Sequence, residues 1–508
     1  MSTRLVRAWL LASLIALCGC ASAPRAPLQP LCILHTNDVH GHITAEKVEG
    51  WKKPSGGAAV LSGCVREIRS SNRAAGVPTL LLDAGDIFLG TPEGNMSKGI
   101  AVTEVMNAAG YDAMAIGNHE FDLGVDVVNA LAASARFPIL GANVRIPPGR
   151  APPAFLRPYV VKECGGLKVG IIGVITELTP AVMMPGRNEK IVFERPQEII
   201  RACIADLKAQ GVDFIILLSH CGSWEDRKIA AEVEGIGVIV GGHGHELLRK
   251  ALRVGSTGTL IVQAGGTGQY LGRIDCEVDP QSGRAARYRY KVIPLEKDRC
   301  APDPAVEEIL KKWEAKVGEK FDETVGSSLS DFSGSDTGEG TLGDLITDSM
   351  RAATRAEIAF QNNYGIRNPL LKGPVTIRDI YKIMPFDNTL YTMTLTGAQV
   401  LKILEQSLAL KDGILQLSGL RVEYDPKAAP GARVRSVSCG DRELDPRGTY
   451  TVATSSYLAQ GGDSYATFLD GREVTNTGIL DRDAFAEHLR ARSSISAEGL
   501  APARLIPR

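Results

Sequence analysis

The chain has 508 residues, which is long for one domain and favours two domains with short accessory segments. Its composition is that of a globular protein, with 44% apolar and 23% charged residues and a formal net charge of -1. The near-neutral charge argues against a partner that is a nucleic acid polymer, and the aromatic content of 6% disfavours a carbohydrate groove.

The first 30 residues are predicted to direct export rather than to join the fold. Arg4 and Arg7 precede an apolar run over 8–17 that is too short for a mature membrane-spanning helix and is typical of a signal peptide. The segment 1–20 ends in a Leu-Cys-Gly-Cys sequence that resembles a bacterial lipoprotein cleavage box, with Cys20 as the lipidated residue. Residues 21–30, rich in proline and small side chains, are predicted to be a tether.

We therefore expect an exported protein that acyl chains at Cys20 hold to a bacterial membrane, facing the periplasm or the cell exterior. The alternative is an ordinary secretory signal with an incidental cysteine. Beyond Cys20 the cysteines show no CxxC spacing, and we do not interpret them as metal ligands. In an oxidising compartment some of them can pair, but the sequence leaves their connectivity open.

Apolar runs alternate with helical stretches between residues 31 and 295. Runs that predict buried strands begin near residues 32, 79, 113, 139, 168, 213, 237 and 259. Helical periodicity covers 57–71, 99–109 and 196–210. This alternation predicts a layered α/β domain over 31–295. A charged helix within 302–325 is predicted to connect it, across 296–326, to a second domain.

Polar side chains follow several of these runs, at the edge where α/β sheets place their sites. The densest group is 117–122, in which Asn118 offers a neutral oxygen, His119 titrates near neutral pH and Asp122 can hold the imidazole. Five of the eight histidines stand at predicted strand ends: His40, His119, His220, His243 and His245. Scattered core histidines would not collect in this way.

Asp38, Asp86 and Asn118 stand at the same strand ends and complete a set of mixed oxygen and imidazole donors. Such donors suit zinc, manganese or a similar divalent ion, and they are too many for one tetrahedral ion. A carboxylate that bridges two ions about 3.5–4 Å apart accommodates them. The remaining polar candidates have structural interpretations: His35, His42 and Glu120 as supporting groups, Asp83 as a turn residue, Cys221 as packing and His488 as a surface residue.

These motifs, in this order, resemble those of calcineurin-like metallophosphoesterases, and with the second domain they resemble the 5′-nucleotidase family. That family includes ecto-5′-nucleotidases, periplasmic UDP-sugar hydrolases and 2′,3′-cyclic-nucleotide phosphodiesterases. The resemblance implies a four-layered α-β-β-α sandwich, then a smaller α+β substrate-binding domain over 327–492 and a frayed tail over 493–508. It implies one divalent ion on Asp38, His40, Asp86 and His245, and another on Asp86, Asn118, His220 and His243.

The resemblance also implies that Asp86 bridges the ions and that His119, oriented by Asp122, forms the catalytic dyad. In the second domain it assigns a nucleotide pocket. Phe386 and Tyr457 would sandwich the base, Asp463 would accept hydrogen bonds from the ribose, and Arg367 and Asn362 would hold the anion. For each aromatic residue the alternative is core packing. A hinge rotation is expected to bring the two rings toward the metals.

Two departures from the family pattern concern specificity. Asn363 and Tyr364 replace glycines before Arg367, and the stretch 331–339 lacks the arginines common in nucleotidases. We expect a metal-dependent phosphoester hydrolase that releases phosphate from nucleotides. The alternatives are hydrolysis of UDP-sugars, cyclic nucleotides or a non-phosphate ester, as in thiosulfohydrolase relatives, or a nucleotide-binding lipoprotein without turnover. Oligomeric state stays open.

Overall fold

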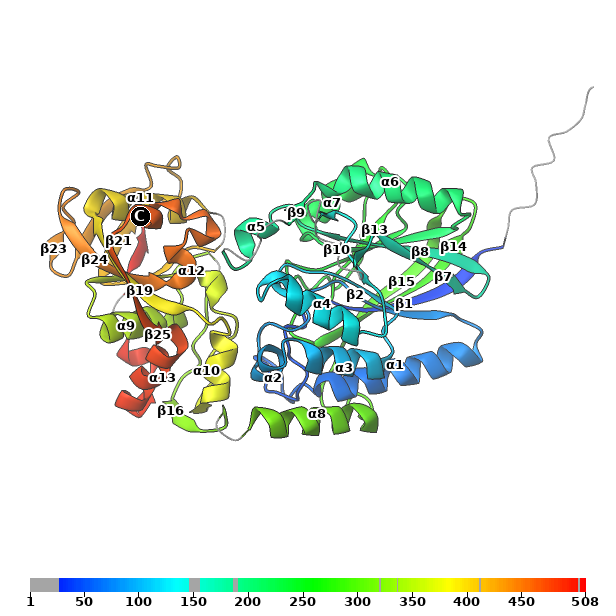
Figure 1. Cartoon of the computed structure of the whole chain (residues 1–508), viewed down its shortest axis with the longest axis horizontal. Coiled ribbons are helices and arrows are strands. Elements are labelled where there is room, and N and C mark those ends of the chain that lie inside the picture. Colours follow the sequence, from blue (N-terminus) through cyan, green and yellow to red (C-terminus); the bar gives the residue numbers. More distant parts are fainter. Residues whose placement is uncertain are drawn as a thin grey trace, which may run out of the picture.

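The computed structural model describes residues 27–145, 156–185, 191–318, 321–335, 337–410, 413–500 and 503–508. A larger N-terminal domain and a smaller C-terminal domain lie side by side (Figure 1). The predicted signal peptide and Cys20 lie outside the described residues. Strand β1 (Gln29–Thr36) already includes the last two residues of the predicted tether, which is therefore shorter than 21–30. No helix within these ranges combines the length and the hydrophobicity needed to cross a bilayer.

The first sheet of the N-terminal domain has parallel strands at its centre and an antiparallel edge. Its order is β15 (Arg284–Pro294), β14 (Tyr270–Asp279), β1, β2 (Thr79–Asp83), β3 (Ala113–Ala115), β4 (Ile139–Leu140) and β6 (Leu156–Arg157). From β1 to β6 neighbouring strands are parallel, so their carboxyl ends share one edge. The pair β14 and β15 was not predicted from the sequence, although the alternating burial along β14 is typical of a half-buried strand.

A second sheet stacks against the first. Its order is β12 (Leu252–Arg253), β13 (Leu260–Val262), β11 (Val238–Gly241), β10 (Phe214–His220), β8 (Leu167–Ile175) and β7 (Tyr159–Cys164). Leu31 and Ile33 of the first sheet share one buried cluster with Ile171 and Phe214 of the second, which places an apolar layer between the sheets. The short strands β5 (Val144–Arg145) and β9 (Val192–Phe193) pair separately.

Helices cover both outer faces of this pair of sheets and complete the four-layered α-β-β-α sandwich expected from the sequence (Figure 1). Against the first sheet lie α1 (Gly57–Ala74), α3 (Ile100–Ala109) and α4 (Val125–Ser134), and against the second lie α6 (Pro196–Ala209) and α7 (Ser223–Glu232). The first half of α1 is buried on all sides over residues 57–65, and the helix becomes exposed toward its C-terminal end. Short helices α2 (Pro92–Met96) and α5 (Thr179–Val182) lie on the side of the second domain.

The predicted connector helix is α8 (Pro304–Val317), which packs on α3 and α1 and therefore belongs to the N-terminal domain. Trp313 Nε1 donates a hydrogen bond of 3.0 Å to Glu104 on α3. A disulfide between Cys64 and Cys300 ties the segment before α8 to α1. The chain enters the C-terminal domain with β16 (Thr324–Ser328), and this strand lies partly inside the range that the sequence predicted as a helical connector.

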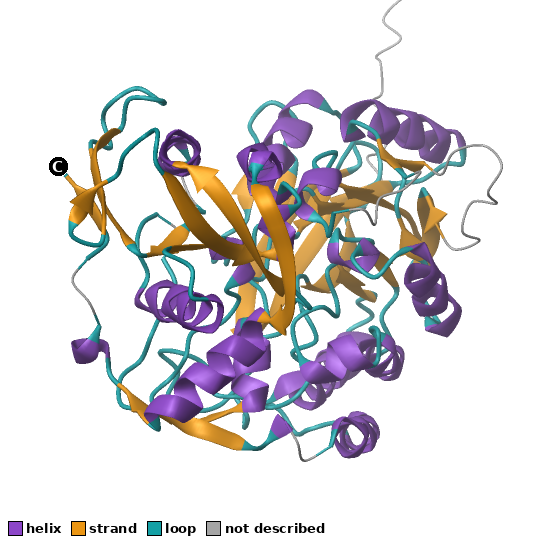
Figure 2. Ribbon diagram, turned by 60° about the vertical axis from the view of Figure 1, so that its left-hand side comes forward, coloured by secondary structure: helices purple, strands orange, loops and turns teal. Residues whose placement is uncertain are grey.

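The C-terminal domain has mixed α and β structure, and its curved strands and flanking helices face the reader in Figure 2. Its main sheet runs β20 (Gln416–Ser418), β17 (Ile358–Gln361), β24 (Thr449–Ser455), β19 (Thr389–Thr396) and β25 (Arg472–Leu480). A three-stranded sheet has the order β18 (Gly373–Thr376), β16 and β26 (Ser494–Ile495). A four-stranded sheet has the order β23 (Arg442–Glu443), β22 (Val434–Cys439), β21 (Leu420–Tyr424) and β27 (Leu505–Pro507). The helices are α9 (Thr341–Thr354), α10 (Ile377–Ile383), α11 (Gly397–Ala409), α12 (Ser456–Ala459) and α13 (Asp481–Arg492).

Two predictions for the end of the chain were wrong. Residues 493–508 are not a frayed tail, because β26 pairs with β16 and β27 pairs with β21. Arg504 is buried and donates hydrogen bonds of 2.8 Å to the Leu417 carbonyl and to Asp348. His488 is not a surface residue, because it lies on the inner face of α13 with 6% of its surface exposed.

Candidate dinuclear metal site

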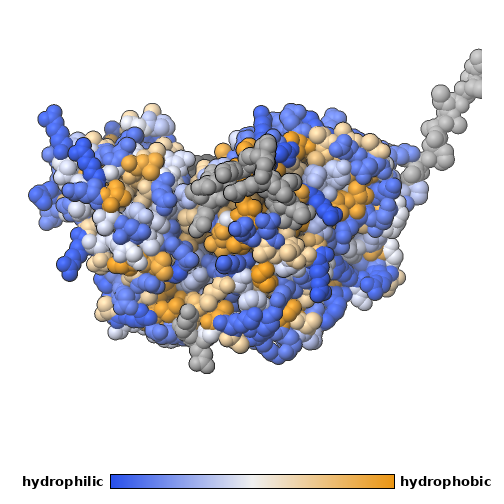
Figure 3. Space-filling model, in the orientation of Figure 1, coloured by the Kyte–Doolittle hydropathy of each residue, from blue (hydrophilic) through white to orange (hydrophobic). Residues whose placement is uncertain are grey.

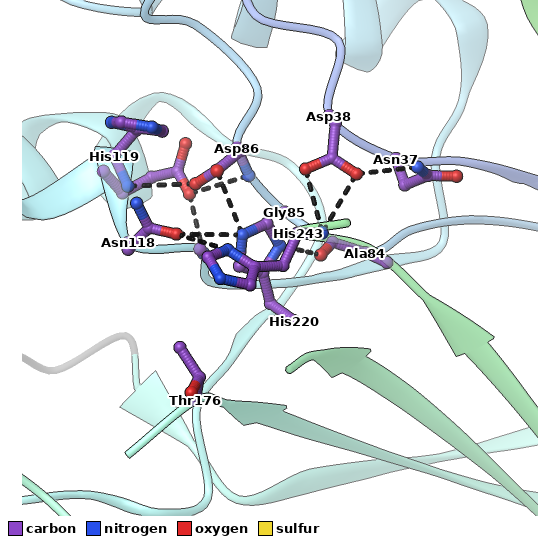
Figure 4. A network of polar contacts seen from close by, with 12 residues as sticks. Asn37, Asp38, Ala84, Gly85, Asp86, Asn118, His119, Thr176, His220 and His243 are labelled. Atoms are coloured by element: carbon purple, nitrogen blue, oxygen red, sulfur yellow. Dashed lines mark hydrogen bonds and ion pairs between the residues drawn. The ribbon is translucent and has the colours of Figure 1, made fainter. Parts of the chain in front are cut away.

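Parallel strands of both sheets end at the same edge of the sandwich, and the predicted donors follow these ends. Asp38 and His40 follow β1, Asp86 follows β2, and Asn118 follows β3. His220 ends β10, and His243 and His245 follow β11. Figure 4 shows how side chains from both sheets converge there. The site therefore lies at the carboxyl ends of the parallel strands, where the direction of the strands places ligand sites in α/β folds.

Asp38, His40 and His245 form the first cluster of donor atoms, all within 4.8 Å of one another. His40 Nε2 lies 3.1 Å from His245 Nε2, and His245 Nε2 lies 3.5 Å from Asp38 Oδ1. Asp86 approaches this cluster, with its Oδ2 3.9 Å from His40 Nε2. These are the four side chains expected around one ion.

Asp86, His220 and His243 form the second cluster, and Asn118 closes it. Asp86 Oδ2 lies 3.0 Å from His220 Nε2. Asn118 Oδ1 lies 3.2 Å from His220 Nε2 and 3.0 Å from His243 Nδ1. The same Asp86 oxygen thus faces both clusters, which is the position that a bridging carboxylate needs.

Backbone carbonyls fix the tautomers of two of these histidines. His40 Nδ1 donates to the Leu89 carbonyl at 2.8 Å, and His220 Nδ1 donates to the Ala84 carbonyl at 2.7 Å. Because a carbonyl can only accept, each ring carries a proton on Nδ1, and Nε2 is the nitrogen that points into the cluster. Metal-binding histidines are commonly oriented in this way.

The electrostatics of the site suit bound cations. Burial, with lesser contributions from nearby cations, lowers the pKa of His243 to about 3 and those of His40 and His245 well below their ordinary range, which keeps these rings neutral and able to coordinate. Burial also lowers the pKa of His220, yet the carboxylates of Asp86 and Asp38 raise it to about 10. Without metal His220 therefore carries a proton on both ring nitrogens, and it must release the Nε2 proton to coordinate an ion. The mixed nitrogen and oxygen donors fit two divalent ions.

Five of the seven predicted ligands have a left-handed backbone: Asp38, His40, Asp86, His243 and His245, with φ between 49° and 71°. Each such residue costs about 1–3 kcal/mol, so the surrounding structure must impose the geometry. Part of that structure is a set of close backbone approaches. A Cβ on Gly117 would lie 2.2 Å from Asp86 Oδ1, so only glycine fits there.

Glu120 joins the loop after β2 to the loop after β3. Its buried carboxylate accepts hydrogen bonds from the backbone N–H groups of Asp86 at 3.0 Å, Ile87 at 2.9 Å and Gly117 at 2.7 Å. Burial raises the pKa of Glu120 to about 7. The expectation that it is a supporting carboxylate is confirmed by these contacts, which hold the backbone at Asp86 and just before Asn118.

His119 and Asp122 form the expected pair beside the clusters. His119 Nδ1 donates to Asp122 Oδ2 at 2.6 Å, so its Nε2 is the free ring nitrogen. Burial lowers the pKa of His119, but Asp86 and Asp122 outweigh this and raise it above its ordinary value. The other oxygen of Asp122 accepts the backbone N–H of Met184 at 2.7 Å. This segment after α5 acts through its backbone and carried no signal in the sequence.

The other candidate histidines and cysteine have structural contacts. His35 is fully buried and stacks on Tyr290, with ring centroids 5.9 Å apart. His42 Nδ1 pairs with Glu46 at 2.6 Å. Cys221 is buried in the cluster under α6 and α7 and does not belong to either donor group. Asp83 accepts hydrogen bonds from Thr36 and from the Gly85 backbone, in agreement with a turn residue.

One cavity of about 810 Å³ connects the clusters to the C-terminal domain. Its lining includes His119 and Asp122 together with the predicted ligands Asp86, Asn118, His243 and His245. All five residues expected to bind substrate also line it: Asn362, Arg367, Phe386, Tyr457 and Asp463. Figure 3 shows the hollow between the two domains along the upper edge of this face. Catalytic and substrate candidates from both domains therefore share one space.

Each substrate candidate has a definite contact in this cavity. Arg367 Nη2 lies 2.9 Å from His40 Nε2, and the Phe386 ring lies 5.7 Å from the His119 ring. Tyr457 and Asn362 both donate to Asp463, at 2.7 and 3.0 Å. Phe386 is therefore beside the predicted dyad, and the stacking of a base against it stays a prediction.

Contacts between the domains position these groups, and these contacts were not predicted from the sequence. Asn95 donates to the Pro385 carbonyl at 2.8 Å, next to Phe386, and Tyr457 donates to the Ala181 carbonyl at 3.2 Å. Ion pairs join Glu93 with Arg378 and Glu46 with Lys382. Long-range pairs of this kind leave no local pattern in a sequence.

Two donor clusters that share a carboxylate, with a histidine–aspartate pair at their side, define a dinuclear metallohydrolase on a sandwich fold. The sequence of residues 32–247 matches the calcineurin-like phosphoesterase family, and that of residues 319–470 matches the family of 5′-nucleotidase C-terminal domains. Snake venom 5′-nucleotidase from Naja atra is 30% identical over 519 residues, covering 92% of this chain and 96% of that protein.

Two further comparisons agree. The trifunctional nucleotide phosphoesterase protein YfkN of Bacillus subtilis (strain 168) is 31% identical over 92% of this chain, although the match spans only 34% of that protein. The crystal structure of a 5′-nucleotidase precursor from Thermus thermophilus has a TM-score of 0.86 at 32% identity, covering 94% of this chain and 99% of that one. The chain belongs to the 5′-nucleotidase family of metal-dependent phosphoester hydrolases.

Proposed function

We propose that this protein is an exported, lipid-anchored nucleotidase that releases phosphate from nucleotides. The observation that carries the proposal is the shared cavity, which joins His119, Asp122 and the donor clusters to the substrate candidates of the C-terminal domain. A protein that only binds nucleotides would need neither the hydrogen-bonded pair of His119 and Asp122 nor both clusters of metal donors.

In this proposal Asp38, His40, Asp86 and His245 hold one divalent ion, and Asp86, Asn118, His220 and His243 hold the other. Zinc and manganese fit these nitrogen and oxygen donors best. When bound, such ions neutralise charge on phosphoryl oxygens and lower the pKa of a bound water.

His119 supplies the acid. Its Nδ1 proton is committed to Asp122, and the raised pKa favours a second proton on Nε2, which faces the cavity. From there it can donate a hydrogen bond to a phosphoryl oxygen or a proton to the leaving alkoxide. Asp122 keeps the ring in place and stabilises its cationic form.

The C-terminal domain supplies the nucleotide contacts. Phe386 offers a ring beside His119, and Tyr457 offers a second ring whose hydroxyl is already held by Asp463. Asp463 can accept hydrogen bonds from ribose hydroxyls. Arg367 places a guanidinium at the donor clusters, where an anion would bind, and Asn362 offers an amide for the same anion.

Export rests on the N-terminal segment, with Cys20 as the site of lipidation. The disulfide between Cys64 and Cys300 supports it, because disulfides persist mainly in oxidising compartments such as the periplasm. Mass spectrometry of the membrane fraction tests the anchor. A diacylglyceryl modification on Cys20 is expected, and an unmodified soluble protein would contradict this part of the proposal.

The activity is tested by phosphate release after metal stripping and re-addition of manganese or zinc. The panel contains AMP, ATP, UDP-glucose, 2′,3′-cyclic AMP and p-nitrophenyl phosphate. Asp122→Ala should lower kcat by about 10²–10⁴ while both metals stay bound, because the orientation of the acid is lost. Asp126→Ala, an exposed carboxylate on α4, is the matched control and should leave kcat unchanged.

Metal-dependent release from AMP supports the proposal. Preferred turnover of UDP-glucose or the cyclic nucleotide would favour those alternative esters. If two metals are bound and none of the phosphoesters is hydrolysed, the result would point instead to a non-phosphate ester or to a binding role.

A further inference from the structure

The backbone that carries Phe386 is held from both domains. The Pro385 carbonyl accepts a hydrogen bond of 2.8 Å from Asn95 Nδ2, which lies on α2 of the N-terminal domain. The Phe386 carbonyl accepts one of 2.9 Å from Arg482 Nη1, which lies on α13 of the C-terminal domain. Two successive carbonyl groups beside the ring are therefore each fixed by a side chain from a different domain.

The guanidinium of Arg482 is held in place by further contacts. Its Nη2 donates to Asp387 Oδ1 at 2.6 Å, and the group lies over the Tyr381 ring, 4.4 Å from the ring centroid. The Arg482 side chain is 13% exposed, whereas that of Asp387 is 70% exposed, so the ion pair itself adds little to stability. What the rigid fork of the guanidinium provides is a fixed direction for two consecutive residues, Phe386 and Asp387.

Asn95 connects the same segment to a predicted metal ligand. Its Oδ1 accepts the backbone N–H of Gly90 at 2.9 Å, and the preceding residue, Leu89, supplies the carbonyl that holds His40 Nδ1. The two ends of one amide thus join the loop behind His40 to the backbone just before Phe386.

The orientation of the Phe386 ring depends on this backbone. The ring is half-buried, lies 5.7 Å from the His119 ring and packs against buried residues of the N-terminal domain. Neither Asn95 nor Arg482 is among the described residues that line the cavity, so both reach its contents through the Phe386 backbone. A planar group of the substrate stacks on the ring only while the ring is correctly oriented, and a smaller correctly oriented fraction weakens binding in proportion.

We propose that Arg482 and Asn95 are positioning residues, which hold the Phe386 ring from opposite domains in the orientation that stacks on the base of a nucleotide. Their effect is confined to substrates that carry a base, because neither residue acts at the phosphoryl group. The inference rests on the proposed hydrolysis of nucleotides and names two residues that set its preference for a base.

The test compares AMP with ribose 5-phosphate, which is the same phosphomonoester without the base. Initial rates of phosphate release give kcat and KM of the full chain, loaded with manganese, for both substrates. Arg482→Met and, separately, Asn95→Asp should each raise KM for AMP about tenfold, within the range that stacking of one base supplies, and should change kcat/KM for ribose 5-phosphate less than about twofold. Asn95→Asp keeps an acceptor for Gly90 but cannot donate to the Pro385 carbonyl.

The matched controls are Asn107→Asp and Arg490→Met. Asn107 also bridges two backbone groups, because it accepts the Arg136 N–H at 2.7 Å and donates to the Ser134 carbonyl at 2.8 Å, but it does so within the N-terminal domain. Arg490 lies on the same helix as Arg482 and forms ion pairs of its own. Neither control should change the ratio of the two substrates.

A double variant separates positioning from a general defect. Phe386→Ala should lower kcat/KM for AMP alone, and adding Arg482→Met to it should cause no further loss, since both substitutions act on one ring. Additive losses would overturn the inference.

The inference would also be overturned by equal losses with AMP and ribose 5-phosphate, or by an unmodified protein that uses both substrates equally well. These outcomes leave phosphoester hydrolysis intact. If neither substrate is hydrolysed with metals bound, the proposed function fails, and the inference fails with it.

Discussion

Glu120→Gln tests whether this residue holds the two ligand loops together. The carboxylate accepts three backbone N–H groups, two on Oε2 from Asp86 and Gly117 and one on Oε1 from Ile87. A glutamine of the same shape has one acceptor oxygen. If that oxygen keeps the first two bonds, the amide NH₂ must face the N–H of Ile87, and one buried donor loses its partner.

The magnitude follows from these three bonds. A buried N–H without a partner costs about 1–3 kcal/mol. The two remaining bonds change from charge-assisted to neutral, which removes about 1 kcal/mol more. We therefore expect the free energy of unfolding of the metal-free protein to fall by about 2–4 kcal/mol. Since Asp86 and Asn118 lie on the two loops, metal affinity should fall about 10–100-fold.

The assay is urea unfolding at pH 8 together with calorimetric titration of manganese into stripped protein. At this pH Glu120 is ionised, because its pKa is about 7. Glu163→Gln, an exposed residue on β7, controls for the loss of one charge. If Glu120→Gln unfolds and binds manganese as the control does, the carboxylate does not position the loops and the reasoning fails.

Two other predictions concern stability far from the metals. Arg504→Met should lower the free energy of unfolding by about 3–5 kcal/mol, because it removes a buried guanidinium that bonds Asp348 and the Leu417 carbonyl. The exposed Arg508→Met should cost less than about 1 kcal/mol, and chemical unfolding that finds the two variants equal would contradict a docked C-terminus. Burial raises the pKa of Asp481 to about 7 from 3.8, so this group favours the folded state fully below about pH 4 and progressively less as pH rises to 7. Asp481→Asn should therefore gain stability relative to the unmodified chain between pH 4 and 8, by a few kcal/mol, while the exposed Asp483→Asn should show no such trend in urea unfolding at several pH values.

The sequence predicted best what depends on local pattern and strand polarity. Apolar runs such as β10 and β2 indicate buried parallel strands, and polar residues at their carboxyl ends must meet at one edge, so the seven donors can be grouped from the sequence alone. The substrate candidates were reachable only through family resemblance. Nothing in the local pattern around Phe386 distinguishes a ring beside His119 from a ring in the core.

What could not be predicted depends on long-range contacts. The partner of Cys64 is 236 residues away, and only the docking of the segment before α8 makes it Cys300. Arg504 resembles a solvent-exposed residue near a chain end, but Asp348 and the Leu417 carbonyl hold it in the C-terminal domain. His488 lies on a short polar helix, and its burial is decided by the elements that α13 packs against.

The left-handed backbone of five ligand residues has a consequence for the stability of the chain. At each of these positions glycine would relieve about 1–2 kcal/mol of strain, so the fold alone would be more stable without the side chains it carries there. A variant with glycine at one of these positions should therefore unfold at higher urea concentration in the absence of metal, although it has lost a donor atom. The donor clusters are thus an example of a site whose geometry lowers the stability of the fold that carries it.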